Sequence, residues 1–154
     1  MQVLQYCRRR KITLISDSKA VIGTAFPAIY EQFVDNGNLF PKHHYLFVSG
    51  LVYGFLHKLK SDKKIIKQYT YVDAISRRDF TLDILDIIYF LMKDGESSEL
   101  EIFKEMLQIA DGGILALEKI YKANKNFMIN NLIIESEKLW IDQLKEFHNI
   151  NLKE

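Results

Sequence analysis

HHYLFVSGLVYGFLHKL, residues 43–59, is the stretch that determines the fold class of this chain. Its apolar residues fall at positions 46, 47, 48, 51, 52, 55, 56 and 59, which is a broad stripe with helical period. A stripe of this width is typical of a helix buried in a core. Gly50 and Gly54 lie one turn apart on it, so we expect a second helix to approach its backbone closely there.

The same period continues toward the C-terminus. Residues 80–93 predict a helix that ends near Gly95, and the capping box formed by Ser98 and Glu101 predicts the start of the next one. That helix should run to the Asp111-Gly112-Gly113 triplet, which we interpret as an abrupt corner between helices. Two further helices are expected over 114–121 and 129–147.

The N-terminal side is less regular. Asp17 and Ser18 resemble an N-cap, which predicts a short helix through Ala25. Pro27 then opens a helix that closes at the DNGN turn, residues 35–38. We therefore predict an all-α fold: one domain over 1–154, a compact bundle of six or seven helices with a minor β element near 11–15 or 69–72.

Composition supports a folded helical domain. The chain has 154 residues, 48% of them hydrophobic and 27% charged, with only 7 glycines and 2 prolines. Few turn residues argue against a sandwich or barrel. Cys7 is the single cysteine, which excludes an internal disulfide and a cysteine-based metal site. The absence of a signal peptide and of a long apolar run predicts a cytoplasmic protein without membrane contact.

Charge is unevenly distributed along the chain. Residues 1–80 carry 13 Lys and Arg against 6 Asp and Glu, whereas residues 81–154 carry 8 against 14. A basic half and an acidic half suit a polyanion-facing surface, two different protein partners, or self-association into a homo-oligomer. Chance clustering of solvated charge explains the split equally well.

No residue pattern predicts catalysis, a metal site or a cofactor. His43 and His44 are adjacent and have no Asp or Glu three or four residues away, and we interpret all four histidines, His43, His44, His57 and His148, as solvated or capping residues. Asp83 and Asp86 share a helix face, which we interpret as the solvated face of an amphipathic helix. Glycine-rich phosphate loops and nucleophile elbows are missing.

One segment, residues 58–78, has a functional character because cations and tyrosines alternate in it. Basic side chains neutralise phosphates, and tyrosines can stack on exposed bases. An ordinary solvated loop would have the same composition. The candidate contact residues for a nucleic acid or a partner are Lys58, Lys60, Lys63, Lys64, Lys67, Tyr69, Tyr71, Arg77 and Arg78.

Two stretches together give a family resemblance. FVSGLVYGFLHKLKSDK (47–63) places a glycine in the middle of a helix before a basic turn, and residues 79–121 end in I-A-D-G-G-I-x-x-L. This order resembles the small proteins associated with DNA-phosphorothioation (Dnd) systems, over about residues 45–121. In that family the late motif reads roughly Y-A-N-G-G, whereas this chain has Ile109-Ala110-Asp111.

The resemblance implies a context rather than a reaction. It suggests a non-catalytic accessory or scaffold subunit of a prokaryotic DNA-modification or anti-phage defence system, working beside a larger ATPase or nuclease and near DNA. A free-standing DNA-binding regulator is the first alternative, although helices 80–93 and 98–111 are acid-rich. A small metal-dependent nuclease built on Asp83 and Asp86 is the second.

Overall fold

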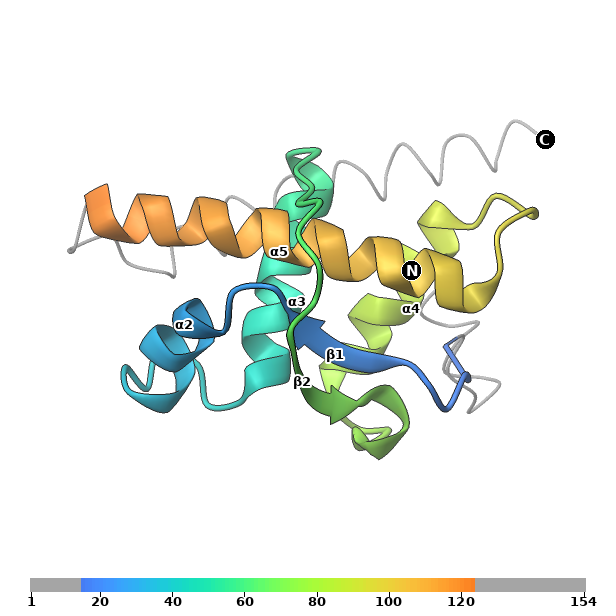
Figure 1. Ribbon diagram of the computed structural model, residues 1–154. Coiled ribbons are helices and arrows are strands. Elements are labelled where there is room, and N and C mark those ends of the chain that lie inside the picture. Colours follow the sequence, from blue (N-terminus) through green and yellow to red (C-terminus); the bar gives the residue numbers. More distant parts are fainter. Residues whose placement is uncertain (1–14, 124–154) are drawn as a thin grey trace.

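Among the described residues, helix α5 (Glu99–Ala123) is the longest element, and the other described elements are arranged around it (Figure 1). The computed structural model describes residues 15–123 of the chain. Its α-helices are α2 (Pro27–Tyr30), α3 (His43–Leu56), α4 (Phe80–Met92) and α5. Two short strands, β1 (Val21–Thr24) and β2 (Lys67–Tyr71), pair below α5 and beside the lower part of α3 in the view of Figure 1.

Helices α3 and α5 cross at glycines. A Cβ atom on Gly50 would lie 2.7 Å from the carbonyl oxygen of Ala110, and a Cβ on Gly113 would lie 2.9 Å from the backbone nitrogen of Gly54. Real Cβ atoms do not approach other atoms that closely, so only glycine permits this crossing. The close approach expected at Gly50 and Gly54 is confirmed, and its partner is the glycine-containing turn of α5.

The strands form a two-stranded antiparallel sheet. Val21 is opposite Tyr71 and Ile22 is opposite Thr70, but the next pair joins Gly23 to Gln68. The shift of register leaves Tyr69 as an extra residue on β2, which is the pattern of a β-bulge. Bulges redirect the side chain of the extra residue, and Tyr69 turns toward α2 and α3.

Short helical segments complete the described fold. Helix α2 has Pro27 in its first turn, as predicted, and continues directly as the π-helix η1 (Glu31–Asp35). The 3₁₀-helix η2 (Val72–Ala74) follows β2 and leads to α4. The capping box is confirmed at the start of α5: the Ser98 N–H donates to Glu101 Oε2 and the Glu101 N–H donates to Ser98 Oγ, both over 3.2 Å.

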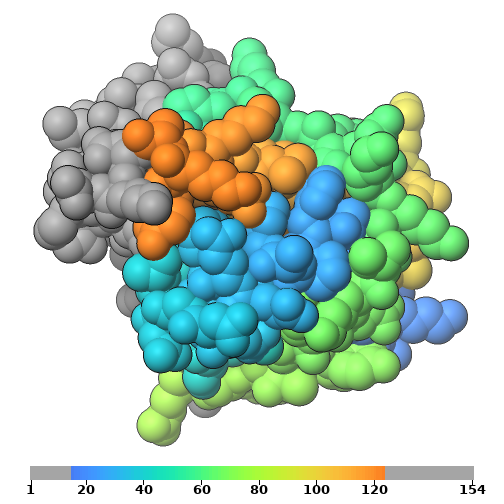
Figure 2. All heavy atoms as spheres, turned by 60° about the vertical axis from the view of Figure 1, so that its left-hand side comes forward, coloured from blue at the N-terminus to red at the C-terminus, as the bar shows by residue number. Residues whose placement is uncertain are grey.

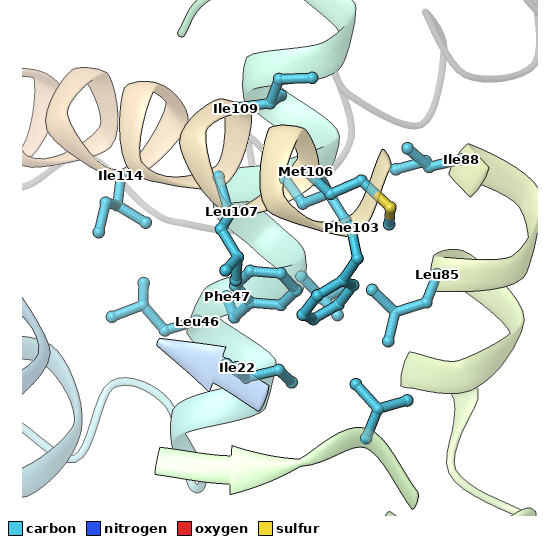
Figure 3. Close-up of a cluster of buried hydrophobic side chains, with 14 of the residues drawn as sticks. Ile22, Leu46, Phe47, Leu85, Ile88, Phe103, Met106, Leu107, Ile109 and Ile114 are labelled. Carbon is cyan, nitrogen blue, oxygen red and sulfur yellow. The ribbon is translucent and has the colours of Figure 1, made fainter. Parts of the chain in front are cut away.

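The hydrophobic core lies between α3, α4, α5 and β1. Figure 3 shows side chains from these four elements converging on one another, with Phe47 and Phe103 near the centre. Fully buried side chains in this cluster include Ile22, Leu46, Phe47, Leu51, Leu85, Ile88, Phe103, Met106 and Ile114. Leu46, Phe47, Val48 and Leu51 of the apolar stripe that predicts α3 are buried in this core.

The prediction of six or seven helices is wrong. The described residues form four α-helices and a two-stranded sheet, not a bundle of six or seven helices. One cause is the Asp111-Gly112-Gly113 triplet, which lies inside the continuous helix α5 instead of forming a corner. Glycines there provide clearance for neighbouring backbone, so the triplet marks a contact and not a turn.

The second cause is the segment after Asp17. The Asp17 carboxylate does accept a backbone hydrogen bond, from the N–H of Lys19 over 2.8 Å, but it caps a tight turn and no helix follows. The chain then extends as β1, where Ile22 is fully buried and pairs with β2. Of the two predicted β elements, 69–72 overlaps β2, whereas most of 11–15 lies outside the described residues, as does the predicted helix 129–147.

Candidate functional site

The predicted cations of segment 58–78 all lie exposed on the surface. We call these seven residues the basic ridge: Lys58, Lys60, Lys63, Lys64, Lys67, Arg77 and Arg78. The chain between α3 and β2 crosses over α5 and then continues into the sheet (Figure 1). In Figure 2 the same green part of the chain runs along the right-hand side of the molecule, beside the blue residues of β1 and α2.

Backbone contacts fix the course of the ridge. The Ser61 N–H donates to the carbonyl oxygen of Gln108 on α5 over 2.9 Å, and the Ile66 N–H donates to that of Thr24 over 3.0 Å. A Cβ on Gly112 would lie 2.6 Å from the backbone nitrogen of Lys60, so Gly112 allows the segment to lie directly on α5. Because these contacts hold the backbone, they also fix the positions from which the lysine side chains extend into solvent.

Charge on the ridge is only partly compensated. Segment 58–78 contains seven cations and two acids, Asp62 and Asp73. Lys60 forms an ion pair with Glu105 over 3.4 Å, with both side chains about half exposed. Within the described part of the chain, Lys63, Lys64 and Arg78 have no ion-pair partner. An exposed cluster of one sign attracts polyanions.

The two tyrosines predicted for the site have different environments. Tyr71 is 52% exposed. Tyr69 instead stacks on Tyr30 with a centroid distance of 4.8 Å and on His43 with one of 4.2 Å. Burial raises the pKa of Tyr69 to about 12, helped by the negative charge of Asp35. The bulge therefore directs the ring of Tyr69 toward Tyr30 and His43, and Tyr71 is the more exposed of the two predicted tyrosines.

An aromatic pair that no sequence pattern predicts lies close to the arginines of the ridge in the chain. Phe80 at the start of α4 stacks on Tyr45 of α3, with a centroid distance of 5.3 Å and planes 17° apart. Phe80 is still 53% exposed. We call Tyr45 and Phe80 the aromatic platform. The two residues are far apart in sequence, and Phe80 reads as an ordinary helix residue, so no local pattern predicts the pair.

The start of α4 is held by a carboxylate at the edge of this platform. Asp79 accepts hydrogen bonds from the Thr81 N–H over 2.9 Å and the Tyr45 hydroxyl over 3.3 Å, and it lies 3.1 Å from His44 Nε2. Burial opposes ionisation of Asp79, but the hydrogen bonds from Thr81 and His44 outweigh it and lower the pKa of this carboxyl. This contact joins α3 to α4 and orients the ring of Tyr45.

A buried polar cluster lies beneath the sheet. Asp111 of α5 accepts a hydrogen bond from Thr24 Oγ1 over 2.6 Å and another from the Ala25 N–H over 2.9 Å. Burial raises the pKa of Asp111 although both bonds favour the charged form. Burial also raises the pKa of the neighbouring Tyr30 well above its usual value, with a contribution from the Asp111 charge. The tyrosine is therefore a poor acid, and the cluster serves to attach the end of β1 to α5.

The described histidines have structural contacts. His43 Nε2 lies 3.0 Å from Asp35 Oδ1, His44 contacts Asp79, and the ring of His57 lies against Tyr53. A search of the described residues finds no group of three or more His, Cys, Asp or Glu that could hold a metal ion. A histidine paired with a carboxylate can act as a general base, and His43 and Asp35 form such a pair. The hydroxyl-bearing side chain stacked on His43 is Tyr69, and burial raises the pKa of Tyr69, which makes its hydroxyl a poor nucleophile.

The interpretation of Asp83 and Asp86 as a solvated pair is wrong for one member. Asp86 is only 3% exposed and lies on the buried face of α4. The helix is therefore not divided into an apolar and a wet face at this position. His148 and Cys7 lie outside the described residues.

Comparisons with protein-family models, with curated protein sequences and with solved structures found no match. Within residues 15–123, none of the helices has both the length and the apolarity that crossing a membrane requires.

Proposed function

We propose that this chain is a non-catalytic accessory subunit of a prokaryotic DNA-modification or anti-phage defence system, acting in the cytoplasm, and that the basic ridge is its contact with DNA. The observation that carries the DNA contact is the exposure of all seven ridge cations within one stretch of the chain, residues 58–78. The association with a larger ATPase or nuclease rests on the family resemblance alone.

The ridge suits phosphate binding for a physical reason. Its backbone is hydrogen-bonded to α5 and to the end of β1, so binding does not have to order the segment first. Lys63, Lys64 and Arg78 have no carboxylate to leave among the described residues. Each phosphate that such a side chain neutralises releases a condensed counterion, which is the main source of sequence-independent affinity for DNA.

The residues of the two motifs behind the family resemblance act in the packing of this chain. Gly50 of the first motif and Gly113 of the second meet at the crossing of α3 and α5. Asp111 of the second motif binds the end of β1. Because these residues act in packing, the function of the resembling family is carried to this chain as a proposal only.

The two alternatives receive less support. A regulator that reads the major groove needs a basic, exposed helix face, whereas the ridge lies in a loop, in β2 and in a turn. A nuclease that uses Asp83 and Asp86 around a magnesium ion needs both carboxylates at a solvent-accessible site, and Asp86 is buried.

The test is fluorescence anisotropy of the full chain with labelled DNA over a salt series. We expect binding that weakens steeply with salt, and a variant with Lys63, Lys64, Arg77 and Arg78 changed to alanine should bind far more weakly. The matched control changes four exposed lysines outside the ridge to alanine and removes the same charge: Lys19, Lys93, Lys104 and Lys119. Equal loss of affinity in both variants, or no binding at low salt, would overturn the proposal.

A further inference from the structure

Exposed apolar surface accompanies the cations of the ridge. Ile66 is 70% exposed, Tyr71 is 52% exposed and Phe80 is 53% exposed. All three lie within or directly after the basic segment 58–78. Of these three, Phe80 is the one whose ring is also held by a neighbouring aromatic side chain, so it is the strongest candidate for a contact with a ligand.

Cations lie close to the aromatic platform in the chain and, at Tyr45, in space. Arg77 and Arg78 immediately precede the Asp79–Phe80 step, and both are exposed. Lys42 Nζ lies 5.9 Å from the centroid of the Tyr45 ring. Tyr45 supports one face of Phe80 by stacking, which fixes the orientation of the Phe80 ring. A held aromatic ring that follows two exposed arginines in the chain can receive another flat ring while cations bind the phosphates next to it.

The form of the nucleic acid follows from this combination. In a duplex the bases are stacked on one another and present only their edges, so an exposed aromatic face on the protein adds little to phosphate contacts. In a single strand each base has a free face, and stacking on aromatic side chains contributes substantial, sequence-tolerant affinity. We infer that the basic ridge and the aromatic platform together bind single-stranded nucleic acid, with unpaired bases stacked on Phe80 and Tyr71. This inference rests on the proposed DNA contact and specifies its substrate class.

The experiment separates bases from phosphates. The full chain is titrated against a labelled dT oligomer of about 16 nucleotides, an abasic oligomer of the same length, and a duplex. We expect the dT oligomer to bind about tenfold or more tighter than the abasic one, which has the same phosphates but no bases to stack. Phe80→Leu should remove most of this preference, because leucine keeps apolar area but has no flat face, and Phe80→Trp should preserve it.

Controls keep the result specific. Phe90→Leu changes another partly exposed phenylalanine of α4 and should leave the preference intact. Circular dichroism of each variant verifies that the total helix content is unchanged. A preference for dT that responds to Phe80 and not to Phe90 supports the inference.

Failure would have two distinguishable forms. Equal binding of the dT and abasic oligomers, with affinity still lost in the ridge variant, would overturn the stacking inference and leave the DNA proposal standing. An exposed platform would then belong to a protein interface. No binding of any of the three oligomers at low salt would overturn both.

Discussion

Replacing Gly113 by alanine should destabilise the protein strongly, because the added methyl group meets backbone and not a movable side chain. The new Cβ would lie against the carbonyl oxygen of Gly50 and 2.9 Å from the nitrogen of Gly54. Neither group can rotate away, so α3 and α5 would have to separate by about 1 Å or more to relieve the contact.

The size of the stability loss follows from the side chains that move apart when α3 and α5 separate. The interface between α3 and α5 contains Phe47, Leu51, Met106 and Ile114, all fully buried. A gap of this size forfeits about a quarter to a half of the dispersion energy across it, and core overpacking typically costs about 1–3 kcal/mol. Alanine recovers about 1 kcal/mol of helix propensity relative to glycine. Since the clash involves two backbone segments, we expect a net loss of about 3 kcal/mol in the free energy of unfolding.

Urea denaturation followed by circular dichroism measures this loss directly. Thermal unfolding gives a second measure of the loss. At about 2–4 °C per kcal/mol for a chain of this size, the melting temperature should fall by about 6–12 °C. Gly95→Ala is the matched control, because a Cβ there meets nothing within 4 Å and only the positive φ of 79° opposes it. That control should cost about 1–2 kcal/mol. If Gly113→Ala were no less stable than Gly95→Ala, the close crossing of α3 and α5 would be refuted.

Three further predictions concern polar contacts. Asp111→Ala should lower the free energy of unfolding by about 2–3 kcal/mol in urea titrations at pH 7, since it leaves the buried Thr24 hydroxyl without its acceptor; a neutral result would contradict the attachment of β1 to α5. Ser98→Ala should cost about 1 kcal/mol in the same assay by removing the capping box, and an unchanged midpoint would count against it. The folded-state pKa of Asp79 is lowered, so its stabilisation is present above the unfolded pKa of about 4 and is lost as the pH falls through the folded value. Stability measured from pH 6 down to pH 2 should therefore decline less in Asp79→Asn than in the parent chain, and parallel curves would disprove this.

Periodicity was a sound guide for helices whose buried face is continuous. The stripes of α3 and α4 lie within a few residues of their predicted bounds, and the capping box marks the start of α5. Sequence patterns give the wrong element where one residue type is common both at helix starts and in turns. Asp17 caps a turn with the same hydrogen bond that would begin a helix, and only the distant partner strand determines that β1 follows.

The candidate site shows the same division. Exposure of the lysines could be predicted from the sequence, because long charged side chains without buried partners remain in water. The different environments of Tyr69 and Tyr71 could not be predicted, since two tyrosines separated by one residue should share a face of a regular strand. The bulge in β2 and the rings of Tyr30 and His43 explain why only Tyr69 turns inward. These contacts join segments that are distant in sequence.

The Asp111-Gly112-Gly113 triplet explains why a motif can be distinctive without carrying chemistry. Successive residues of a helix point about 100° apart, so three in a row face three different neighbours. Asp111 binds the end of β1, Gly112 lies against the backbone at Lys60, and Gly113 lies against α3. One turn of α5 therefore sets the position of the sheet, the basic ridge and the central helix together. A sequence constraint of this kind identifies the scaffold, and the functional surface must be sought in the exposed residues that the scaffold holds in place.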